Sequence, residues 1–377
     1  MTKIPLAKMP DLAFVLDEAK LEDNLKLLST IQQQSGCTIL LALKSMAMWS
    51  AFPQMRKHLG GTTASSPHEA RLGAEHFGGE VHLFSPAYAD ADLGVMLPLA
   101  SHIVFNSFSQ WQRHKARVQA FPVSCGLRIN PEHSESHTAL YNPCGVHSRL
   151  GITMAEFRPD LLDGIEGFHF HALCDQGPDA LERVLEQVEA RFGEFLPRMK
   201  WVNFGGGHII TKPGYDVDRL IRIIRRFREK WDVEVILEPG TGVTYNAGYL
   251  VATVLDLTHN GMPIAILNTS ASAHMPEVIE TPFRPTVMDA GNPGAKTYTY
   301  RLGGCTCMSG DVFGDYSFDA PLKIGDKIIF EDQMHYTMVR STFFNGIAHP
   351  AITTLKIDGE VVVHRTFGYE DFKRHLG

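Results

Sequence analysis

The sequence lacks the features that mark several specialised classes of protein. None of its 377 residues lies in an apolar run long enough to span a bilayer, and residues 1–16 show no signal-peptide pattern. The net charge is −7 and there is no long basic run, which argues against nucleic acid as a partner. The six cysteines are scattered, and the one close pair, Cys305 and Cys307, has neither zinc nor thioredoxin spacing. We therefore expect a cytoplasmic protein with reduced thiols, no bound metal and no membrane contact.

What the sequence does contain, over its first two thirds, is an alternation of short apolar segments and helical patterns. Eight strands alternating with helices over about two hundred residues are typical of a (β/α)8 barrel. The clearest helical patterns are Asp17–Gln34, Glu69–Phe77, Ser109–Ala120, Asp179–Phe195 and Val217–Lys230. The eight expected strands are Thr38–Leu43, Thr62–Ala64, Val81–Phe84, Ile103–Asn106, Val123–Ile129, Gly167–Ala172, Trp201–Phe204 and Val233–Glu238.

After Glu238 the pattern changes from alternation to a series of β-like segments. Tyr249–Leu257 and Pro263–Leu267 are the first of them, and glycine, proline and aspartate turns separate those that follow. No long helical period returns until Tyr369–His375. We therefore expect an α/β protein in which residues 20–250 form the barrel, while residues 1–19 and 251–377 form a β domain.

Lys44 directly follows the first expected barrel strand, at the end of the apolar run Ile39–Leu43. Barrel enzymes place their chemistry at the carboxyl ends of the strands. A lysine in such a desolvated position can act as a neutral nucleophile and form a Schiff base. A lysine that ends a strand and points into water would have the same local sequence, so Lys44 alone leaves both interpretations open.

Glycine-containing turns follow the last two expected strands, where phosphate sites of barrels commonly lie. Gly205–Gly207 follows the seventh strand, and its N–H groups could form an anion-binding loop. Glu238 follows the eighth strand, and its carboxylate could hold a proton on a heterocycle nitrogen. Gly240 and Thr241 could add phosphate donors, although a Pro-Gly pair also serves simply as a turn.

Three further kinds of side chain could carry chemistry. His169 and His171 alternate on the sixth expected strand, so they share a face, either against a flat cofactor or as hydrogen-bonded core histidines. Cys307, in the glycine-rich segment Gly303–Asp311, is either an exposed thiol suited to proton transfer or a small buried hydrophobe. Tyr336 could reach a phosphate or belong to the core of the β domain.

The order of these motifs along the chain resembles the fold-type III decarboxylases that use pyridoxal 5'-phosphate (PLP). That group includes ornithine and diaminopimelate decarboxylases and alanine racemase, and its fold is a PLP-binding barrel followed by a β domain. A narrower resemblance is to the carboxynorspermidine (carboxyspermidine) decarboxylases. It rests on LALKSM, GTTASS, FGGEVHLFSPAY, GLRINPEHS, YNPC with SRLGI, FHFHALCDQ, TSASAHMP and GYEDFK.

The resemblance implies an activity and an assembly. The activity is the release of CO2 from carboxynorspermidine or carboxyspermidine to give norspermidine or spermidine, a step of polyamine biosynthesis. The assembly is a head-to-tail homodimer whose active sites are shared between subunits. The small-molecule partner is therefore a carboxylated polyamine or a related amino acid.

The resemblance also implies a role for each residue that matches a family motif. Lys44 matches the Schiff-base lysine, His171 the ring stacked on the cofactor, and Glu238 the partner of the pyridine nitrogen. Cys307 matches the thiol that arrives from the second subunit and donates a proton. The implied cofactor contacts are Lys44, Arg128, His171, Gly206, Gly207, Glu238, Gly240, Thr241 and Tyr336. Candidate contacts for substrate amines are Asn268, Glu277, Glu280, Asp311 and Asp315.

Several positions depart from the family pattern, all on the expected substrate side. Each departure removes a negative charge, which leaves open another α-amino acid substrate, such as diaminopimelate or a less cationic amine. A catalytically silent binding protein, like the regulators descended from ornithine decarboxylase, is a further alternative, although the presence of all the catalytic candidates argues against it. The departures are Thr63 and Asn268 in place of aspartate, Met308 in place of an acidic residue, and Thr241-Gly242 in place of Glu-Ala.

Overall fold

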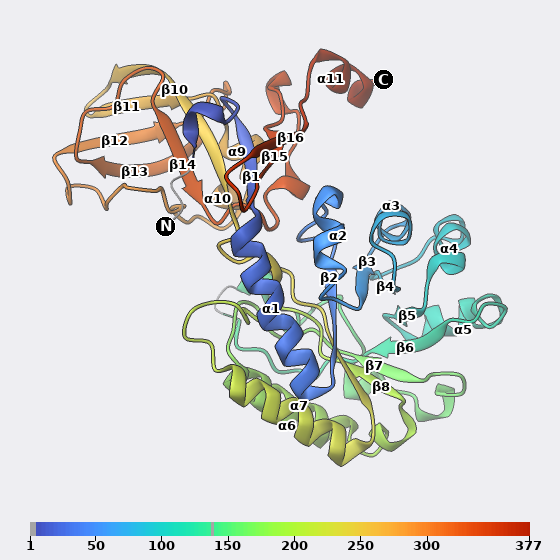
Figure 1. The fold of residues 1–377 in the computed structure, drawn as a ribbon. Coiled ribbons are helices and arrows are strands. Elements are labelled where there is room, and N and C mark those ends of the chain that lie inside the picture. Colours follow the sequence, from blue (N-terminus) through green and yellow to red (C-terminus); the bar gives the residue numbers. More distant parts are fainter. Residues whose placement is uncertain (1–4, 137–138) are drawn as a thin grey trace. The chain divides into compact units, whose positions relative to one another are not determined.

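The computed structural model describes residues 5–136 and 139–377, so residues 1–4 of the expected β domain lie outside the described residues. The chain divides into two compact units. One unit runs from Asn24 to Val243, and the other combines the N-terminal segment through Asp23 with the chain from Thr244 onward (Figure 1). The first unit is an α/β barrel and the second is built around a β-sheet.

Within the described part of the first unit, eight parallel strands close into a barrel, as the sequence predicted. The ring closes because β2 pairs with both β3 and β9. Its strands are β2 (Thr38–Ala42), β3 (Gly61–Ala64), β4 (Glu80–Phe84), β5 (His102–Phe105), β6 (Ser124–Arg128), β7 (Gly167–His169), β8 (Trp201–Asn203) and β9 (Glu234–Leu237).

The barrel strands are apolar because both of their faces are covered. Ile39, Leu41 and Leu43 in and just after β2 are fully buried, as is Leu40 between them. Leu40 belongs to an inward-facing cluster that fills the interior of the barrel together with Val104, Trp201 and Ile236. The barrel is therefore a packed core rather than a pore, and chemistry is confined to its ends.

Helices surround the strands on the outside of the barrel (Figure 1). They are α1 (Glu18–Ser35), α2 (Phe52–Met55), α3 (Pro67–Leu72), α4 (Asp90–Met96), α5 (Phe108–Val118), α6 (Pro178–Phe192), α7 (Val217–Trp231) and α8 (Thr241–Thr244). In the described residues, each helix is too short or too polar to cross a membrane.

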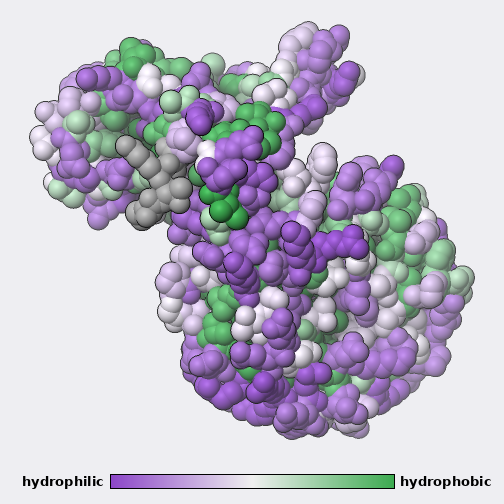
Figure 2. Space-filling view, viewed as in Figure 1, coloured by the Kyte–Doolittle hydropathy of each residue, from purple (hydrophilic) through white to green (hydrophobic). Residues whose placement is uncertain are grey.

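Helix α7 shows why the outer helices form and how they attach. The side chain of Asp216 accepts a hydrogen bond from the Arg219 N–H, 2.9 Å away, which caps its first turn. The helix buries one stripe of leucine, isoleucine and phenylalanine, and it exposes arginines on the opposite face. Figure 2 shows mainly hydrophilic side chains over α6 and α7. The amphipathic pattern therefore determines which face of α7 packs on the barrel.

Two elements of the barrel differ from the sequence-based expectation. The pattern Glu69–Phe77 forms two pieces, α3 and a π-helical turn over Gly73–Phe77. The expected strand Gly167–Ala172 ends early, because β7 stops at His169 and His171 lies beyond its end. There the ring of His171 is held by the Gly206 N–H instead of by a strand partner.

The second unit is a mostly antiparallel sheet in the order β13, β12, β11, β10, β1, β15, β16, with β14 also paired to β10. The N-terminal strand joins it as expected, since β1 pairs with β10 and with β15. Its strands and helices are β1 (Ala13–Asp17), β10 (Gly248–His259), β11 (Pro263–Leu267), α9 (Ala271–His274), α10 (Glu277–Glu280), β12 (Tyr298–Gly303), β13 (Val312–Phe318), β14 (Lys327–Glu331), β15 (Ala351–Leu355), β16 (Val361–Arg365) and α11 (Tyr369–Leu376). The sequence did not predict β13, because glycine and aspartate interrupt its apolar pattern.

Candidate active site

The carboxyl ends of the barrel strands bring several predicted site residues together. Lys44 lies just past β2, Arg128 is the last residue of β6, and Glu238 follows β9. The guanidinium of Arg128 donates a hydrogen bond to the carbonyl of His171 over 3.3 Å. Residues about two hundred positions apart in sequence therefore meet at one end of the barrel, as parallel strands require.

Lys44 is the nucleophile candidate of this site. Its side chain keeps a large accessible surface, yet enough protein surrounds the amine that burial lowers the pKa of Lys44 below its usual value. The negative charge of Glu238 opposes this shift in pKa, while Arg128 adds to it. A lysine with a lowered pKa is neutral more often at physiological pH, and the neutral amine is the form that attacks a carbonyl.

Glu238 is held as an anion by its neighbours. Burial alone would raise the pKa of Glu238, but His169 and Asn203 outweigh that effect and lower the pKa. The Asn203 amide donates a hydrogen bond to Oε1 of Glu238 over 2.8 Å, and Nε2 of His169 lies 3.7 Å from Oε2. The site therefore presents a fixed negative charge at the end of the barrel.

The ring of His171 is neutral and fixed in orientation. Burial, together with the positive charges of Lys44 and Arg128, lowers the pKa of His171 well below its usual value. The Gly206 N–H donates to Nδ1 of His171 over 2.9 Å. Because Nδ1 accepts this bond, the single ring proton belongs on Nε2.

The glycine loop after β8 requires residues without a side chain. A Cβ on Gly206 would lie 2.5 Å from the Glu238 carbonyl oxygen and 3.2 Å from Cε1 of His171. At Gly207 the φ of +83° already disfavours other residues, and a Cβ there would lie 2.1 Å from the Leu173 carbonyl oxygen. The loop therefore packs directly between the ring of His171 and the backbone of Glu238. Gly240 and Thr241 lie at the start of α8, next to this loop through Gly242.

The predicted site residues of the β domain form a separate group. Cys307 is exposed, whereas the other cysteines of the chain are buried or partly buried. Tyr336 lines a cavity of about 190 Å³ together with Glu277, Glu331 and Asp332. Its backbone adopts φ = +59°, an uncommon conformation for a tyrosine.

The predicted amine contacts are already engaged within the β domain. Asn268 bonds through both polar atoms, accepting from the Thr253 N–H and donating to the Asp11 carbonyl. Both oxygens of Asp311 accept hydrogen bonds, and its side chain is buried. The remaining three are in ion pairs: Glu277 and Glu280 with Arg340, and Asp315 with Arg301.

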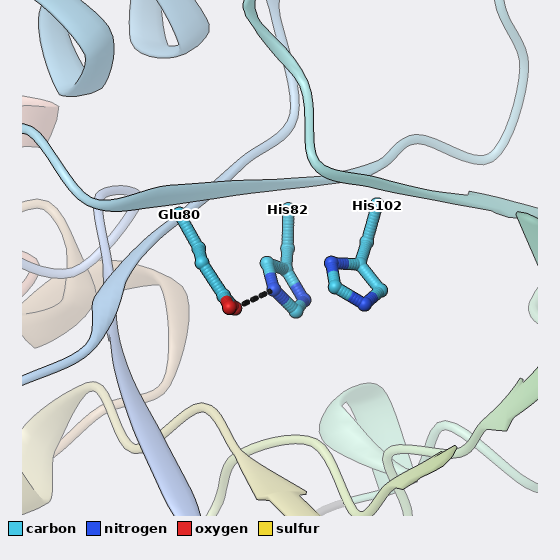
Figure 3. A group of neighbouring side chains, drawn as sticks. All are labelled: Glu80, His82 and His102. Atoms are coloured by element: carbon cyan, nitrogen blue, oxygen red, sulfur yellow. Dashed lines mark hydrogen bonds and ion pairs between the residues drawn. The ribbon is translucent and has the colours of Figure 1, made fainter. Parts of the chain in front are cut away.

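One group of side chains in the described residues has the composition of a metal site. Glu80 and His102 are the first residues of β4 and β5, and His82 is the middle residue of β4. Their ligand atoms lie within 4.8 Å of one another. Figure 3 shows the His82 ring between the other two side chains. Nε2 of His82 lies 2.7 Å from Oε2 of Glu80, and the two imidazoles stack with centroids 3.9 Å apart. This hydrogen bond and the ring stacking account for the close approach of the three side chains.

Sequence reasoning missed Asn203 and gave no role to His169, whereas the family resemblance had singled out His171. Asn203 accepts from the Gly205 N–H over 2.8 Å while it donates to Glu238, so it links the two glycine-containing turns. The position of Asn203 at the end of the seventh barrel strand, facing inward like Trp201 two residues before it, was the available signal. The contact between His169 and the Glu238 carboxylate had no signal in the sequence, because only the fold brings the two side chains together.

These features define a family. The family described as "Pyridoxal-dependent decarboxylase, C-terminal sheet domain" matches residues 13–333, and the chain belongs to it. The protein is thus a PLP-dependent carboxy-lyase by family, with the barrel and sheet domain that the sequence predicted.

Two relatives and one solved structure show which members of the family the chain resembles. The chain is 47% identical to carboxyaminopropylagmatine decarboxylase of Synechocystis sp. over 99% of its own length and 97% of the relative's. It is 44% identical to carboxynorspermidine/carboxyspermidine decarboxylase of Campylobacter jejuni over 96% and 97% of the two chains. The crystal structure of carboxynorspermidine decarboxylase from Campylobacter jejuni, complexed with norspermidine, has a TM-score of 0.91 and 42% identity, covering 97% of this chain and 99% of that chain.

The residues at the end of the barrel fit PLP. The cofactor requires an amine for its aldehyde, an anion for its pyridine nitrogen, a flat neighbour for its ring and N–H donors for its phosphate. Lys44, Glu238 and His171 have the chemical character of the first three, and the glycine loop with the adjoining turn at Gly240 and Thr241 offers backbone N–H groups.

Proposed function

We propose that this protein decarboxylates a carboxylated polyamine, with carboxynorspermidine and carboxyspermidine as the first candidates. One observation carries the proposal. A lysine amine of lowered pKa and a fixed carboxylate share one barrel end, in a chain that matches relatives of that activity over nearly its whole length.

Each barrel residue has a distinct proposed task. PLP, when bound, supplies an electron sink for the bond that releases CO2. Lys44 would hold the cofactor through its aldehyde group. Glu238 would keep a proton on the pyridine nitrogen, and His171 would support the face of the ring. Gly207, Gly240 and Thr241 would donate to the phosphate, and Gly206, whose N–H is bonded to His171, would belong to the same loop. Arg128 would lie near the cofactor, and Tyr336 would be a further phosphate contact.

Attachment through Lys44 can be tested directly. Borohydride reduction of the holoenzyme followed by peptide mapping should place the pyridoxyl group on Lys44. A matched Lys200→Ala variant, changed at an exposed lysine of the barrel, should keep the label, and Lys44→Ala should lose it. Label on any other lysine of the wild-type protein would remove Lys44 from this role.

Cys307 is the proposed proton donor to the former α carbon. Its support is the exposure of the thiol, which is unique among the six cysteines, and the family resemblance of its loop. We further propose a two-fold homodimer in which Cys307 of one chain serves Lys44 of the other, so that each dimer has two composite sites.

Mixed dimers test this arrangement. Inactive Lys44→Ala chains are mixed with inactive Cys307→Ala chains under conditions that exchange subunits. In a mixed dimer one site lacks both residues and the other keeps both, so activity should return to about half of the wild-type value per mixed dimer. Cys305→Ala should remain largely active as the control. Fully exchanged mixtures that stay inactive would contradict the shared site.

A second candidate substrate is carboxyaminopropylagmatine. The observation in its favour is the 47% identity to the Synechocystis decarboxylase named for it. That substrate ends in a guanidinium instead of an amine, a planar cation whose N–H donors have a fixed arrangement.

A substrate panel decides between these candidates. CO2 release is followed with carboxynorspermidine, carboxyspermidine, carboxyaminopropylagmatine and diaminopimelate at equal concentrations. We expect a carboxylated polyamine to give the highest kcat/KM. Release from diaminopimelate alone would overturn the proposal, and PLP binding without CO2 release from any compound would favour a silent binding protein.

Among the predicted amine contacts, we retain Glu277 and Glu280 as candidates, with Asp315 and Asn268 ranked below them. Glu277 lines the cavity that contains Tyr336, and Glu280 lies on the same short helix. Glu277→Gln should raise the KM for a cationic substrate with little change in kcat, because it removes a charge that attracts the amine. An unchanged KM would exclude Glu277.

A further inference from the structure

Asp311 is a buried carboxylate with an unusually complete set of donors. Its side chain is 4% exposed. Oδ1 accepts from Oγ of Ser270 over 3.0 Å and from the N–H groups of Ala271 and Ser272 over 2.7 and 3.3 Å. Oδ2 accepts from the N–H and Oγ1 of Thr306 over 3.2 and 2.6 Å. All five donors are neutral, so Asp311 is held by hydrogen bonds rather than by an ion pair.

These bonds join two segments that sequence analysis singled out for different reasons. One is the TSASAHMP segment, in which Ser270 caps the short helix α9. The other is the loop Gly303–Asp311 that carries the proposed proton donor. Asp311 is the last residue of that loop, and its carboxylate accepts hydrogen bonds from Thr306 in the middle of the same loop.

The three residues Cys305, Thr306 and Cys307 are held by their backbone amides. The Cys305 N–H donates to the Thr269 carbonyl over 3.0 Å, and the Thr306 N–H donates to Asp311. The Cys307 N–H donates to Oδ1 of Asn345 over 2.8 Å. Three consecutive amides are therefore fixed by three separate segments, while the Cys307 side chain stays exposed.

Gly304 shows how closely the loop is built around the carboxylate. A Cβ at this position would lie 2.2 Å from Oδ2, 2.4 Å from Cγ and 2.5 Å from Oδ1 of Asp311. Any other residue would displace the carboxylate from its donors. The glycine is thus required by the close approach of Asp311, and not by its backbone conformation.

We propose that Asp311 is the positioning residue for Cys307, fixing the loop backbone through Thr306 so that the thiol is held ready to donate its proton. This inference rests on the proposed role of Cys307. It also reassigns Asp311, because a buried carboxylate with both oxygens occupied has no free lone pair to offer a substrate amine without breaking these bonds.

The experiment uses isosteric changes at the contact between Thr306 and Asp311. Thr306→Val removes the hydroxyl donor and keeps the β-branch, whereas Thr306→Ser keeps the donor. Asp311→Asn replaces one acceptor oxygen with an NH2 group, which cannot accept a hydrogen bond from the donors on that side. Asp319→Asn, at an exposed aspartate of the same domain, is the control. All variants are made as holoenzymes in the wild-type and the Cys307→Ala backgrounds.

Four measurements distinguish positioning from general stabilisation. In the wild-type background, Thr306→Val and Asp311→Asn should lower kcat by about tenfold, with KM and PLP content within about twofold of wild type. In the Cys307→Ala background the same changes should lower the small residual kcat of that variant by less than about twofold, because residues that act through one group are not additive. Amide hydrogen exchange of the peptide containing residues 305–307 should accelerate. Thr306→Ser should restore both kcat and exchange.

Three results would overturn the inference. Unchanged amide exchange in both variants would show that Asp311 does not hold the loop. Equal losses of kcat in the two backgrounds would show that Asp311 supports the fold and not Cys307. A Cys307→Ala enzyme with wild-type kcat would remove the proposed proton donor itself, and the exchange data would then show separately whether the loop is still held by Asp311.

Discussion

The barrel and the β domain hold their candidate functional groups in different ways. In the barrel, burial and neighbouring side chains together shift the pKa values of Lys44, Glu238 and His171. In the β domain, Cys307 is exposed, and its position depends on backbone amides bonded to Asp311 and Asn345. The barrel therefore determines the protonation states of its candidate groups, whereas the loop determines the position of the Cys307 thiol.

This difference suits the two tasks that we propose. A group that must stay charged or neutral during a reaction needs a fixed electrostatic environment. A group that delivers a proton and is then reprotonated from water needs access to solvent and a defined position. Changes of charge should accordingly be most damaging in the barrel, and changes of hydrogen-bond geometry in the loop.

Among changes to the barrel and the loop, the largest loss of activity is expected from Glu238→Gln. A neutral amide cannot keep the pyridine nitrogen protonated, so we expect the decarboxylation rate to fall by about a hundredfold, or about 3 kcal/mol of activation free energy. PLP should remain bound, since Lys44 is intact. The measurements are kcat and the absorbance of bound cofactor. Glu234→Gln, at the exposed start of the same strand, should retain the wild-type rate; a wild-type rate in Glu238→Gln would exclude the proposed role.

A smaller effect is expected from Asn203→Asp. The new carboxylate can still accept from the Gly205 N–H, but it replaces the donor to Glu238 with a second negative charge. A like charge raises the pKa of Glu238, so the acidic limb of the pH–rate profile should move to higher pH and kcat should fall by about tenfold. An unchanged acidic limb would show that Asn203 does not control this carboxylate.

The smallest effect concerns stability and uses His208 of the barrel. Burial lowers the pKa of His208 to about 4, and in the described residues neither ring nitrogen has a hydrogen-bond partner. The unfolded chain takes up a proton near the ordinary histidine pKa, whereas the folded protein does not. The unfolded state therefore binds more protons between these pKa values, and stability falls as the pH falls through this range.

For this single group, the free energy of unfolding should decrease by about 1 kcal/mol between about pH 7.5 and about pH 5.5. His208→Leu should remove that part of the pH dependence without losing a hydrogen bond. His147→Asn, at an exposed histidine, should leave it unchanged. Urea unfolding at the two pH values measures the difference, and equal pH dependence in His208→Leu and wild type would contradict the assignment.

Much of the fold was predictable because it follows from local patterns. Barrel strands such as β2 have a short apolar run, and helices such as α7 have a continuous amphipathic stripe. The failures have local causes as well. Strand β13 was missed because its glycine and aspartate residues interrupt the apolar pattern. It forms a strand because its backbone pairs with β12.

The candidate site was predictable only in part. Lys44, Glu238 and the glycine turns could be found because chemistry in barrels lies after the strands. The hydrogen bonds of Asp311 could not be predicted. Ser270 lies about forty residues earlier in the chain, and no local pattern marks Thr306 as a donor. A carboxylate looks the same in a sequence whether its oxygens face solvent or five donors.

The sequence by itself determined the order of strands and helices, the residue types at the barrel end and the family to which the chain belongs, because periodicity and motif spacing are local properties. Tertiary structure decided which histidine faces Glu238, that Asn203 joins the two glycine-containing turns, and that Asp311 is buried beneath the Cys307 loop. These are outcomes of packing between distant segments, where burial and hydrogen-bond partners set the charge and the position of each group.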